Sequence, residues 1–287
     1  MSLSRAEIII EALPFIRAFA GKTVVVKYGG NAMTDPALTT GVMQDVILMR
    51  LVGMLPVLVH GGGPQIDQAM KVSGLTPTFV RGLRVTDADT MRIVERVLVG
   101  EINQAIVAQI GRLGGAAIGL SGKDGGLIQA KKAPPAVLPD GHTADLGLVG
   151  TVTGVEPRPI RTLLDAGYVP VVAPTAADET GQTYNINADL VAGEVAAALQ
   201  AEKLVLLTDT DGILDTQSRL LSTLAREAVD RLVADGTISR GMLPKVQACL
   251  TALKGGVRKT HIINGTRPHA LIEELLTAEG IGTEIIG

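Results

Sequence analysis

The stretch "VVVKYGGNAM", residues 24–33, runs an apolar segment into a lysine, Lys27, and then into two glycines. The run of valines predicts a buried strand, because β-branched side chains pack well on a pleated surface. A charge at the end of such a strand lies at the edge of the sheet, and bare glycine backbone lets a ligand approach it closely. This stretch therefore predicts a strand of a parallel sheet with a candidate anion site at its carboxyl end.

The rest of the chain alternates short apolar runs with helical patterns, which predicts an α/β fold with a mainly parallel sheet flanked by helices. The apolar runs predicted as strands cover residues 23–27, 56–60, 117–120, 168–173, 204–208 and 260–263. The helical patterns cover residues 41–54, 87–113, 189–200 and 242–254. Residues 130–156 are rich in glycine, proline and short polar residues and predict hairpins over one edge of the sheet.

The composition of the 287-residue chain excludes several classes of function. Its 26 basic and 29 acidic residues are scattered, so there is no basic stripe for nucleic acid and no polybasic patch for a membrane surface. The single cysteine, Cys249, excludes an internal disulfide framework and a multi-cysteine metal site. No apolar run reaches the roughly 18 residues of a membrane span, and we expect a cytoplasmic protein.

Residues 1–21 are expected to form a separate unit, a helix kinked at Pro14. More than one face of this helix is apolar, through Ile9, Leu13, Phe15, Ile16 and Phe19. Two interpretations stay open. The helix packs on its own domain, or it is exchanged and binds another subunit.

A second glycine loop follows a second apolar run, in "VLVHGGGPQI" at residues 57–66. Here Gly61, Gly62 and Gly63 precede a helix that is expected to begin at Pro64, and the free N–H groups of a helix N-terminus attract phosphate or carboxylate. Either loop alone is equally typical of a tight turn. Both together, at carboxyl ends of parallel strands, favour a ligand site, and neither matches a P-loop or a dinucleotide fingerprint.

Two lysines fit an anionic ligand at this edge. Lys27 at its strand end could neutralise a phosphoryl oxygen, although a lysine that simply extends its ammonium into solvent would have the same sequence pattern. Lys245 lies in the first turn of a helix whose Pro244 suits that position. A cation there is repelled by the positive end of the helix dipole unless a bound anion offsets the repulsion.

Polar residues follow two further strands. Asn185 and Asn187 alternate in the extended segment "YNINAD" and point to one side, and Asp189 then opens a helix, where it could equally be a cap or first-turn carboxylate. Asp209 and Asp211 follow the strand at residues 204–208. Paired acids of this kind can bind magnesium, but a turn is just as common.

These motifs together resemble the amino acid kinase superfamily, most closely the branch that phosphorylates N-acetyl-L-glutamate in arginine biosynthesis. The resemblance covers essentially the whole chain and rests on the order of "KYGGNAM", "HGGGPQI", "GLRVTD", "GLSGKDGGLI", "YNINAD", "LLTDTDGIL", "GMLPKV" and "IING". It implies a three-layer sandwich with an open, mainly parallel central sheet. An acceptor-binding lobe is expected at residues 22–180 and an ATP-binding lobe at residues 181–287.

The resemblance also implies the site residues. The catalytic set is Lys27, Gly30, Asp189 and Lys245, with Asp189 holding both lysines in position. The acceptor contacts are Gly62, Gly63, Arg84, Asn185 and Asn187. The nucleotide contacts are Lys27, Gly29, Asp209, Thr210, Gly212, Leu214, Ile238, Ser239 and Lys245. No residue is assigned as a metal ligand.

The implied reaction moves a phosphoryl group from ATP, bound with Mg²⁺, to the side-chain carboxylate of N-acetyl-L-glutamate. That carboxylate is already ionised at neutral pH, so no general base is needed. The task is to bring two anions together and to spread positive charge over the transferred group. Asp189 is therefore expected to organise the site without accepting a proton.

The N-terminal helix resembles one that links dimers into a hexamer, a trimer of dimers, in family members inhibited by arginine. The resemblance then implies an arginine site that includes Lys203, His269, Glu279 and Gly282. A nitrogen-signalling protein is a further partner that such a hexamer could bind.

Other functions fit parts of the pattern. Kinases for N-acetylaminoadipate, glutamate, aspartate, carbamate or UMP share the lysines and glycines, so substrate identity rests on "GLRVTD" and "YNINAD". A non-catalytic arginine sensor would keep the fold without needing both lysines and Asp189. A dinucleotide-binding dehydrogenase is disfavoured by the missing fingerprint and acidic partner.

Overall fold

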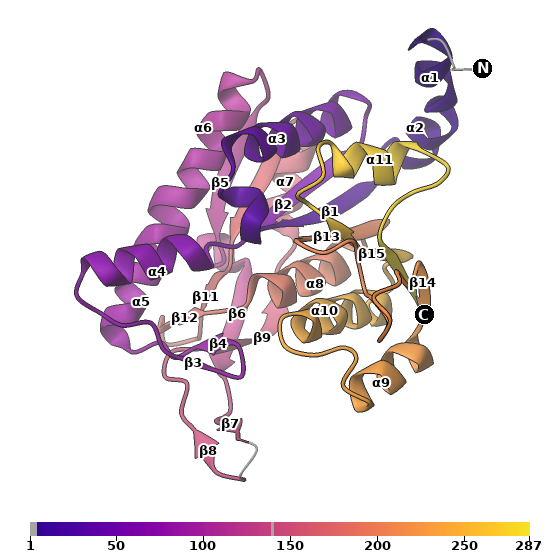
Figure 1. The fold of residues 1–287 in the computed structure, drawn as a ribbon. Coiled ribbons are helices and arrows are strands. Elements are labelled where there is room, and N and C mark those ends of the chain that lie inside the picture. The colour runs from indigo at the N-terminus through magenta and orange to yellow at the C-terminus, as the bar shows by residue number, and fades with distance from the viewer. Residues whose placement is uncertain (1–4, 139–140) are drawn as a thin grey trace.

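The computed structural model describes residues 5–138 and 141–287, and an open eight-stranded sheet runs through its centre (Figure 1). From one edge to the other the strands are β14 (Thr223–Ala225), β16 (Thr283–Ile286), β15 (Lys259–Asn264), β13 (Lys203–Thr208), β1 (Thr23–Tyr28), β2 (Leu55–His60), β10 (Val169–Ala173) and β5 (Ala117–Ser121). The strands from β15 to β5 are parallel, and β16 runs antiparallel to β15. All the strands that the sequence predicted are in this parallel part.

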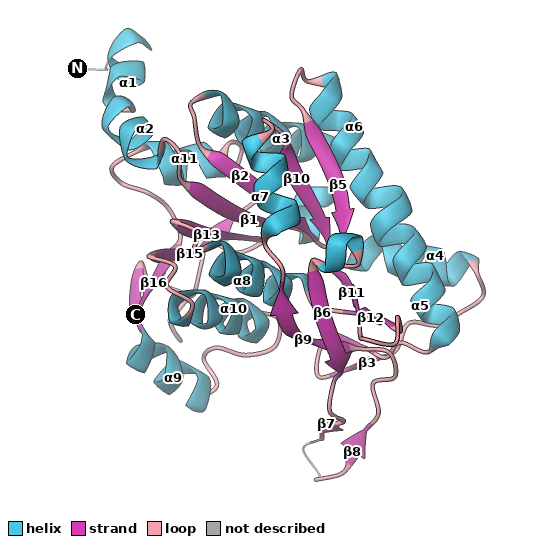
Figure 2. Cartoon of the chain, turned by 180° about the vertical axis from the view of Figure 1, so that it is seen from behind, coloured by secondary structure: helices cyan, strands magenta, loops and turns pink. Residues whose placement is uncertain are grey.

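Helices cover both faces of the sheet, which confirms the three-layer sandwich (Figures 1 and 2). Along β1 the valines alternate, with Val25 packing in the core on one face and Val24 and Val26 in the core on the other. The first face carries α7 (Arg158–Asp165), α8 (Ala188–Leu199), α9 (Arg226–Ala234) and α10 (Met242–Lys254). The second carries α3 (Pro36–Leu51), α4 (Gly63–Val72), α5 (Ala88–Glu95), α6 (Gln104–Arg112) and α11 (Ala270–Leu276).

Smaller sheets and turns surround the carboxyl ends of the central strands. A four-stranded sheet has the order β12 (Thr183–Asn185), β11 (Thr175–Ala177), β6 (Ile128–Lys132) and β9 (Gly150–Val155). Two hairpins pair β3 (Phe79–Val80) with β4 (Leu83–Arg84) and β7 (Ala136–Val137) with β8 (Thr143–Ala144). Short turns form η1 (Gly30–Met33) and η3 (Asp124–Gly126). The hairpins predicted for residues 130–156 are confirmed, and the predicted lobe boundary after residue 180 falls between β11 and β12.

Two predicted helices differ from the observed ones in instructive ways. The helix predicted for residues 41–54 begins earlier, at Pro36, because Asp35 caps it by accepting hydrogen bonds from the N–H groups of Ala37 and Leu38. The helix predicted for residues 87–113 exists, but its middle third is η2 (Arg96–Asn103), a π-helical stretch that joins α5 to α6. No periodicity in the sequence indicated that stretch.

The N-terminal segment is broken where Pro14 predicted a kink, into α1 (Arg5–Glu11) and α2 (Leu13–Phe19), and residues 1–4 lie outside the described chain. Helix α2 packs beside α11, with Phe15, Ile16 and Phe19 against the core. Helix α1 projects from the body in both views (Figures 1 and 2) and exposes Ile9 and Ile10. The structure therefore supports packing of α2 on its own domain and leaves the apolar surface of α1 available.

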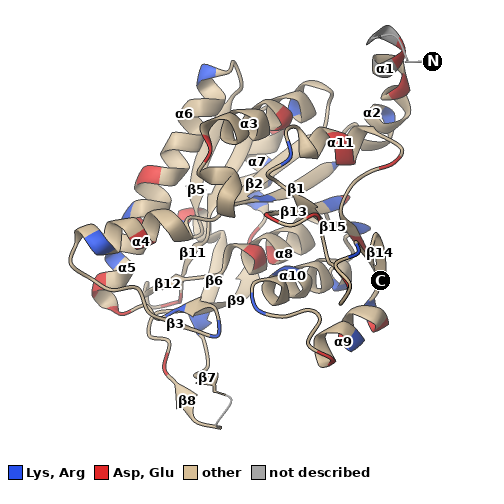
Figure 3. Ribbon diagram, viewed as in Figure 1, with Lys and Arg blue, Asp and Glu red and all other residues tan. Residues whose placement is uncertain are grey.

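Charge is spread over the whole molecule. In the view of Figure 3, lysine and arginine are interspersed with aspartate and glutamate over the ribbon. Within residues 5–138 and 141–287, no helix is both long and apolar enough to cross a lipid bilayer.

Candidate active site

Three charged side chains meet at the carboxyl end of β1. Lys27 Nζ lies 3.0 Å from Asp189 Oδ1, and Lys245 Nζ lies 2.9 Å from Asp189 Oδ2. Lys27 is the penultimate residue of β1, Asp189 lies in the first turn of α8, and Lys245 lies in the first turn of α10. All three are buried or nearly so. The carboxylate thus bridges two ammonium groups that are far apart in the sequence.

The helix start at α8 explains the position of Asp189. Asn187 is the N-cap, and its Oδ1 accepts hydrogen bonds from the N–H groups of Asp189 and Leu190. Because Asn187 fills the capping role, the Asp189 carboxylate is free to face the lysines. Of the alternatives that the sequence left open for Asp189, the first-turn carboxylate is the one observed.

Burial and charge act on this trio in opposite directions. Burial lowers the pKa of the Lys27 ammonium below its ordinary value, and the attraction of Asp189 only partly offsets this effect. Burial alone would raise the pKa of the Asp189 carboxyl, but the charges of Lys27 and Lys245 outweigh it, so the pKa lies below its ordinary value. The single negative charge of Asp189 balances only one of the two ammonium groups. A net positive charge therefore remains to attract an anion.

The two glycine loops lie side by side beneath Lys27. The N–H of Gly61 donates a 2.7 Å hydrogen bond to the carbonyl of Tyr28, which ties one loop to the other. A Cβ on Gly29 would lie 2.9 Å from Lys27 Nζ, so a larger residue there would displace the ammonium group from its observed position. A Cβ on Gly62 would lie 2.4 Å from Ile102 Cδ1. Close packing therefore requires glycine in both loops.

A cavity of about 290 Å³ opens over these loops. It brings together these residues that the sequence analysis assigned to the site: Lys27, Gly30, Gly62, Gly63, Arg84, Asn185, Asn187 and Asp189. Lys245 does not line it directly and reaches it through Asp189. The cavity is large enough for a small dicarboxylate, with cationic groups at two places along its wall.

Arg84 provides the second cationic group in the wall of this cavity. Its Nη1 donates to Asp67 Oδ1 at 2.6 Å, and its Nη2 donates to the Gly63 carbonyl at 3.3 Å. The ring of Phe79 lies over the guanidinium, with 4.7 Å from Cζ to the ring centroid. The sequence analysis missed Asp67 and Phe79. An acid one turn into the helix after the glycine loop was the available signal for Asp67, but such a residue looks the same on any exposed helix.

Apart from Lys27, the predicted nucleotide contacts do not line this cavity. Asp209, Thr210 and Gly212 follow β13, and Asp209 accepts a 3.4 Å hydrogen bond from Asn31 Nδ2 beside the first glycine loop. Asp211 accepts a 2.8 Å bond from Asn264 Nδ2, which makes it part of the local turn structure. Ile238 is buried and Ser239 is exposed. The assignment of this group to ATP stays a prediction.

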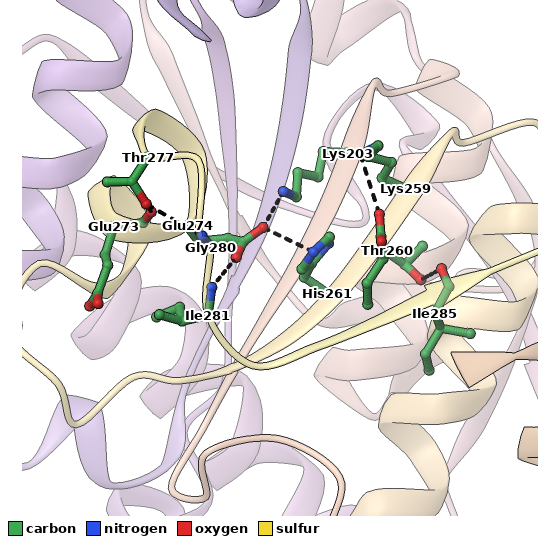
Figure 4. Close-up of polar contacts among 11 residues, drawn as sticks. Lys203, Lys259, Thr260, His261, Glu273, Glu274, Thr277, Gly280, Ile281 and Ile285 are labelled. Carbon is green, nitrogen blue, oxygen red and sulfur yellow. Dashed lines mark hydrogen bonds and ion pairs between the residues drawn. The ribbon is translucent and has the colours of Figure 1, made fainter. Parts of the chain in front are cut away.

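A second cavity, of about 390 Å³, lies under helix α2. It brings together Lys203 and Glu279 of the predicted arginine site with Phe15, Phe19, Lys259, His261, Glu274, Gly280 and Glu284. Glu274 forms an ion pair with Lys203 and lies 3.0 Å from His261 Nε2, while its Oε2 accepts a hydrogen bond from the N–H of Ile281 (Figure 4). The sequence analysis missed His261 and Glu274.

Two residues predicted for that site lie elsewhere. His269 bonds through Nδ1 to Asp45 Oδ1 at 2.6 Å, on helix α3. Gly282 packs against β15, where a Cβ would lie 2.2 Å from the Ile262 carbonyl. Neither lines the second cavity.

The fold and the site together define a class of enzyme: an α/β protein that holds paired lysines over glycine loops to act on small anionic substrates. The sequence pattern of the amino acid kinase family matches residues 22–264. The chain is 54% identical to the acetylglutamate kinase of Moorella thermoacetica, over 99% of this chain and 98% of that protein. It is 53% identical to the acetylglutamate kinase of Heliobacterium modesticaldum, over 99% of each chain. The chain belongs to the amino acid kinase family, among its acetylglutamate kinases.

Solved structures of other proteins share this fold. N-acetylglutamate synthase from Neisseria gonorrhoeae, complexed with coenzyme A and N-acetyl-glutamate, superposes with a TM-score of 0.86 at 28% identity over 99% of this chain. This chain spans 64% of the synthase's length. Carbamate kinase from Giardia lamblia, bound to AMP-PNP, has a TM-score of 0.66 at 19% identity over 93% of this chain and 99% of that one. The latter likeness shows the fold alone.

Proposed function

We propose that this protein transfers the γ-phosphoryl group of MgATP to the side-chain carboxylate of N-acetyl-L-glutamate. The observation that carries the proposal is the contact of Asp189 with both Lys27 and Lys245, beside a cavity that Lys27, Asp189 and Arg84 line. Relatives more than half identical over nearly the whole chain are named acetylglutamate kinase. The cavity supplies separate cationic groups for a carboxylate and for a phosphoryl group.

Electrostatics does most of the chemical work in this reaction. The acceptor carboxylate is ionised at neutral pH, with an ordinary pKa near ~4.3, so no base has to remove a proton. Two anions must instead approach each other against their repulsion. The ammonium groups of Lys27 and Lys245 and the free N–H groups of the glycine loops offset that repulsion, most strongly where charge accumulates in the transition state.

Asp189 has a positioning role in this scheme. Its carboxylate contacts both ammonium groups, and the cap at Asn187 fixes the helix start that carries it. Because its pKa lies below the ordinary value, it stays ionised and accepts no proton in the working pH range. It therefore holds two like charges close together that would otherwise repel each other.

Arg84 and Asn185 are proposed to hold the acceptor at the end away from the lysines. The planar guanidinium can bind the α-carboxylate through two parallel hydrogen bonds, which an ammonium group cannot do. Asn185 Nδ2 donates to Thr86 Oγ1 at 3.2 Å, which leaves its amide oxygen for a ligand N–H. This arrangement favours an N-acylated amino acid over carbamate or UMP.

The MgATP substrate is proposed to enter from the side of β13. The loop with Asp209, Thr210 and Gly212 lies beside the first glycine loop, and Leu214, Ile238 and Ser239 would then border the adenine and ribose. Magnesium arrives with the nucleotide, held largely by phosphate and water oxygens.

A coupled assay of ADP release tests the substrate assignment. The enzyme is offered MgATP with N-acetyl-L-glutamate, N-acetylaminoadipate, glutamate, aspartate, carbamate and UMP in separate reactions. We expect kcat/KM for N-acetyl-L-glutamate to exceed that of every other acceptor by at least about tenfold, since a site built for particular polar groups rejects analogues that lack them. A preference for another acceptor, or no turnover with any, would overturn the proposal.

We further propose that arginine inhibits the enzyme by binding in the cavity under α2. The cavity contains the carboxylates of Glu279 and Glu284 for a guanidinium and an α-amino group, and the aromatic rings of Phe15 and Phe19 for stacking. The Neisseria gonorrhoeae synthase was also solved with coenzyme A and L-arginine, and that structure has a TM-score of 0.81 at 27% identity to this chain. Titrating arginine into the assay tests this: lysine and citrulline should inhibit far less, because neither carries a guanidinium group.

The same proposal extends to assembly. The exposed apolar side chains of α1, Ile9 and Ile10, offer a surface through which N-terminal helices could link dimers into a hexamer. Cytoplasmic location and the docking of a nitrogen-signalling protein stay predictions.

A further inference from the structure

Two polar side chains lie buried behind the second glycine loop. His60, the last residue of β2, is 0% exposed, and Asn103, the last residue of η2, is 1% exposed. Asn103 Nδ2 lies 3.2 Å from His60 Nε2 and 2.9 Å from the Val171 carbonyl. His60 Nδ1 lies 2.9 Å from the Gly61 carbonyl. A chain of hydrogen bonds thus runs from β10 through both side chains to the glycine loop.

The partners fix the direction of every bond in this chain. The carbonyl of Val171 can only accept, so the nitrogen of the Asn103 amide faces it and donates. The same nitrogen can only donate to His60, so Nε2 of the ring carries no proton. The proton is therefore on Nδ1, which donates to the Gly61 carbonyl. Burial lowers the pKa of His60 to about 4, so the ring stays neutral and in this tautomer at neutral pH.

This bond determines where the next N–H points. In a planar trans peptide, the carbonyl of Gly61 and the N–H of Gly62 point in opposite directions. Because the carbonyl faces the buried imidazole, the N–H of Gly62 faces the other way, toward the cavity that Gly61, Gly62 and Gly63 line. No backbone acceptor elsewhere in the described residues receives it. A flip of this peptide would present a carbonyl oxygen to the anion instead.

The end of η2 supplies a second support beside Asn103. Ile102 and Asn103, the last two residues of this π-helical stretch, are both buried. Ile102 fills the space beside Gly62, where a Cβ would lie 2.4 Å from its Cδ1. The Asn103 amide fills the space beside Gly119, where a Cβ would lie 1.8 Å from its Oδ1.

We propose that His60, held by Asn103, is a positioning residue that keeps the Gly62 N–H directed at the transferred phosphoryl group. The inference rests on the proposed phosphoryl transfer and deepens it. Charge on the phosphoryl oxygens is greatest in the transition state, so loss of this donor acts mainly on kcat. A pair that only stabilised the core would leave kcat per folded molecule unchanged.

Two isosteric substitutions separate these possibilities. In His60→Asn the amide nitrogen can take the place of Nδ1 and still donate to the Gly61 carbonyl. In His60→Gln the amide oxygen takes the place of Nε2 and accepts from Asn103, and no donor reaches the Gly61 carbonyl. Each variant keeps one hydrogen bond of the ring, so each is expected to lose similar stability. We expect His60→Asn to keep kcat within about threefold, and His60→Gln to lose about 10- to 100-fold with KM for both substrates within about threefold.

A binding measurement checks the same point without turnover. The probe is aluminium fluoride bound together with MgADP and N-acetyl-L-glutamate. The aluminium fluoride mimics the phosphoryl group in the transition state of its transfer. His60→Gln should weaken the binding of this mixture at least about tenfold and leave the affinity for MgADP alone unchanged. His60→Asn should keep both affinities. Equal kcat in the two variants, or losses that follow their unfolding midpoints, would overturn the inference while leaving the proposed function intact. Failure of the unmodified enzyme to turn over N-acetyl-L-glutamate would overturn the proposed function instead.

Discussion

The ammonium group of Lys27 combines burial with positive charge, and the structure shows what makes the combination tolerable. Asp189 lies 3.0 Å away and answers the charge before any substrate binds. Lys245 shares the same carboxylate, so neither lysine is fully neutralised. A bound phosphoryl group would supply the missing negative charge. The two lysines and Asp189 together carry a net positive charge, which favours an anionic ligand.

Lys27 and Lys245 are predicted to act mainly by stabilising the transition state. Lys27→Arg misplaces the charge and Lys245→Ala removes it, so each should lower kcat by about 10²- to 10³-fold and change KM by much less. Steady-state kinetics with both substrates varied will show the division. A loss confined to KM would mean that these lysines only bind the ground state.

The pH dependence follows from the environment of Lys27. Burial lowers the pKa of its ammonium, so the functional charged form is lost at a lower pH than for an exposed lysine, whose pKa is near ~10.4. We expect kcat/KM for MgATP to fall on the alkaline side before that value. Asp189 raises the pKa of Lys27, so Asp189→Asn should move the alkaline fall to still lower pH. An alkaline limb that is unchanged in the variant would contradict this reading.

Lys27 and Lys245, which carry a charge near the end of an element, were predictable from sequence, and the family resemblance supplied Asp189 as their partner. The partner of Arg84 was not predictable. Lys27 and Lys245 stood out because a cation at a strand end or in a first helical turn needs an answer. Asp67 did not, because an acid on a helix is usually solvated. The pairing of His60 with Asn103 gave no signal, since the two residues are 43 positions apart in the sequence and meet only in the folded chain.

At the scale of the element, α11 is tied to the sheet by one carboxylate. Glu274 pairs with Lys203 on β13 and His261 on β15, all buried. Burial alone would raise the pKa of Glu274, but His261 and Lys203 lower it to about 2. The pairing therefore joins the predicted regulatory cavity to the central sheet, and it fixes α11 against two neighbouring strands.

Removing that carboxylate should be costly in a pH-dependent way. Glu274→Gln leaves the Lys203 ammonium buried without its partner, so the free energy of unfolding at pH 7 should fall by about 3 to 5 kcal/mol. Since the folded pKa lies below the ordinary one, the contribution is present above about pH 4.5 and is lost as pH falls toward 2. Denaturant unfolding at pH 7 and pH 3 should show the gap to the unmodified protein narrowing.

The neighbouring Glu273 provides a matched control. It pairs with Arg267 at 2.9 Å but is partly exposed, so Glu273→Gln should change stability by less than about 1 kcal/mol. Equal effects of the two substitutions, or a gap for Glu274→Gln that is constant with pH, would show that burial of the ion pair was misjudged.

Elements were predicted as well as their local signals allowed. The strands of the parallel part were found because β-branched runs buried on both faces have no other common explanation. The short strands β14 and β16 were missed, since they lie at the edge and mix polar with apolar residues. The start of α3 was missed because Gly41 suggested a boundary, while the Asp35 cap before Pro36 sets the real one.

At the scale of the whole molecule, we propose that the segment α1–α2 takes part in both regulation and assembly. Helix α2 places Phe15 and Phe19 in the wall of the second cavity, and α1 projects beyond the body with exposed isoleucines. Deletion of residues 1–20 should therefore leave dimers that still turn over but are no longer inhibited by arginine. Light scattering and the arginine titration measure both effects. Hexamers that stay sensitive to arginine after the deletion would refute the role assigned to this segment.

We propose that two lysines distant in the sequence, together with the glycine loops, contact the phosphoryl group while it is transferred. The most direct measurement is a crystal structure with MgADP, aluminium fluoride and N-acetyl-L-glutamate bound together. The ammonium nitrogens of Lys27 and Lys245 and the backbone nitrogen of Gly62 should each lie within about 3.2 Å of a fluorine of the planar group. A structure in which either lysine points away from that group, or lies beyond hydrogen-bond reach of it, would contradict the account.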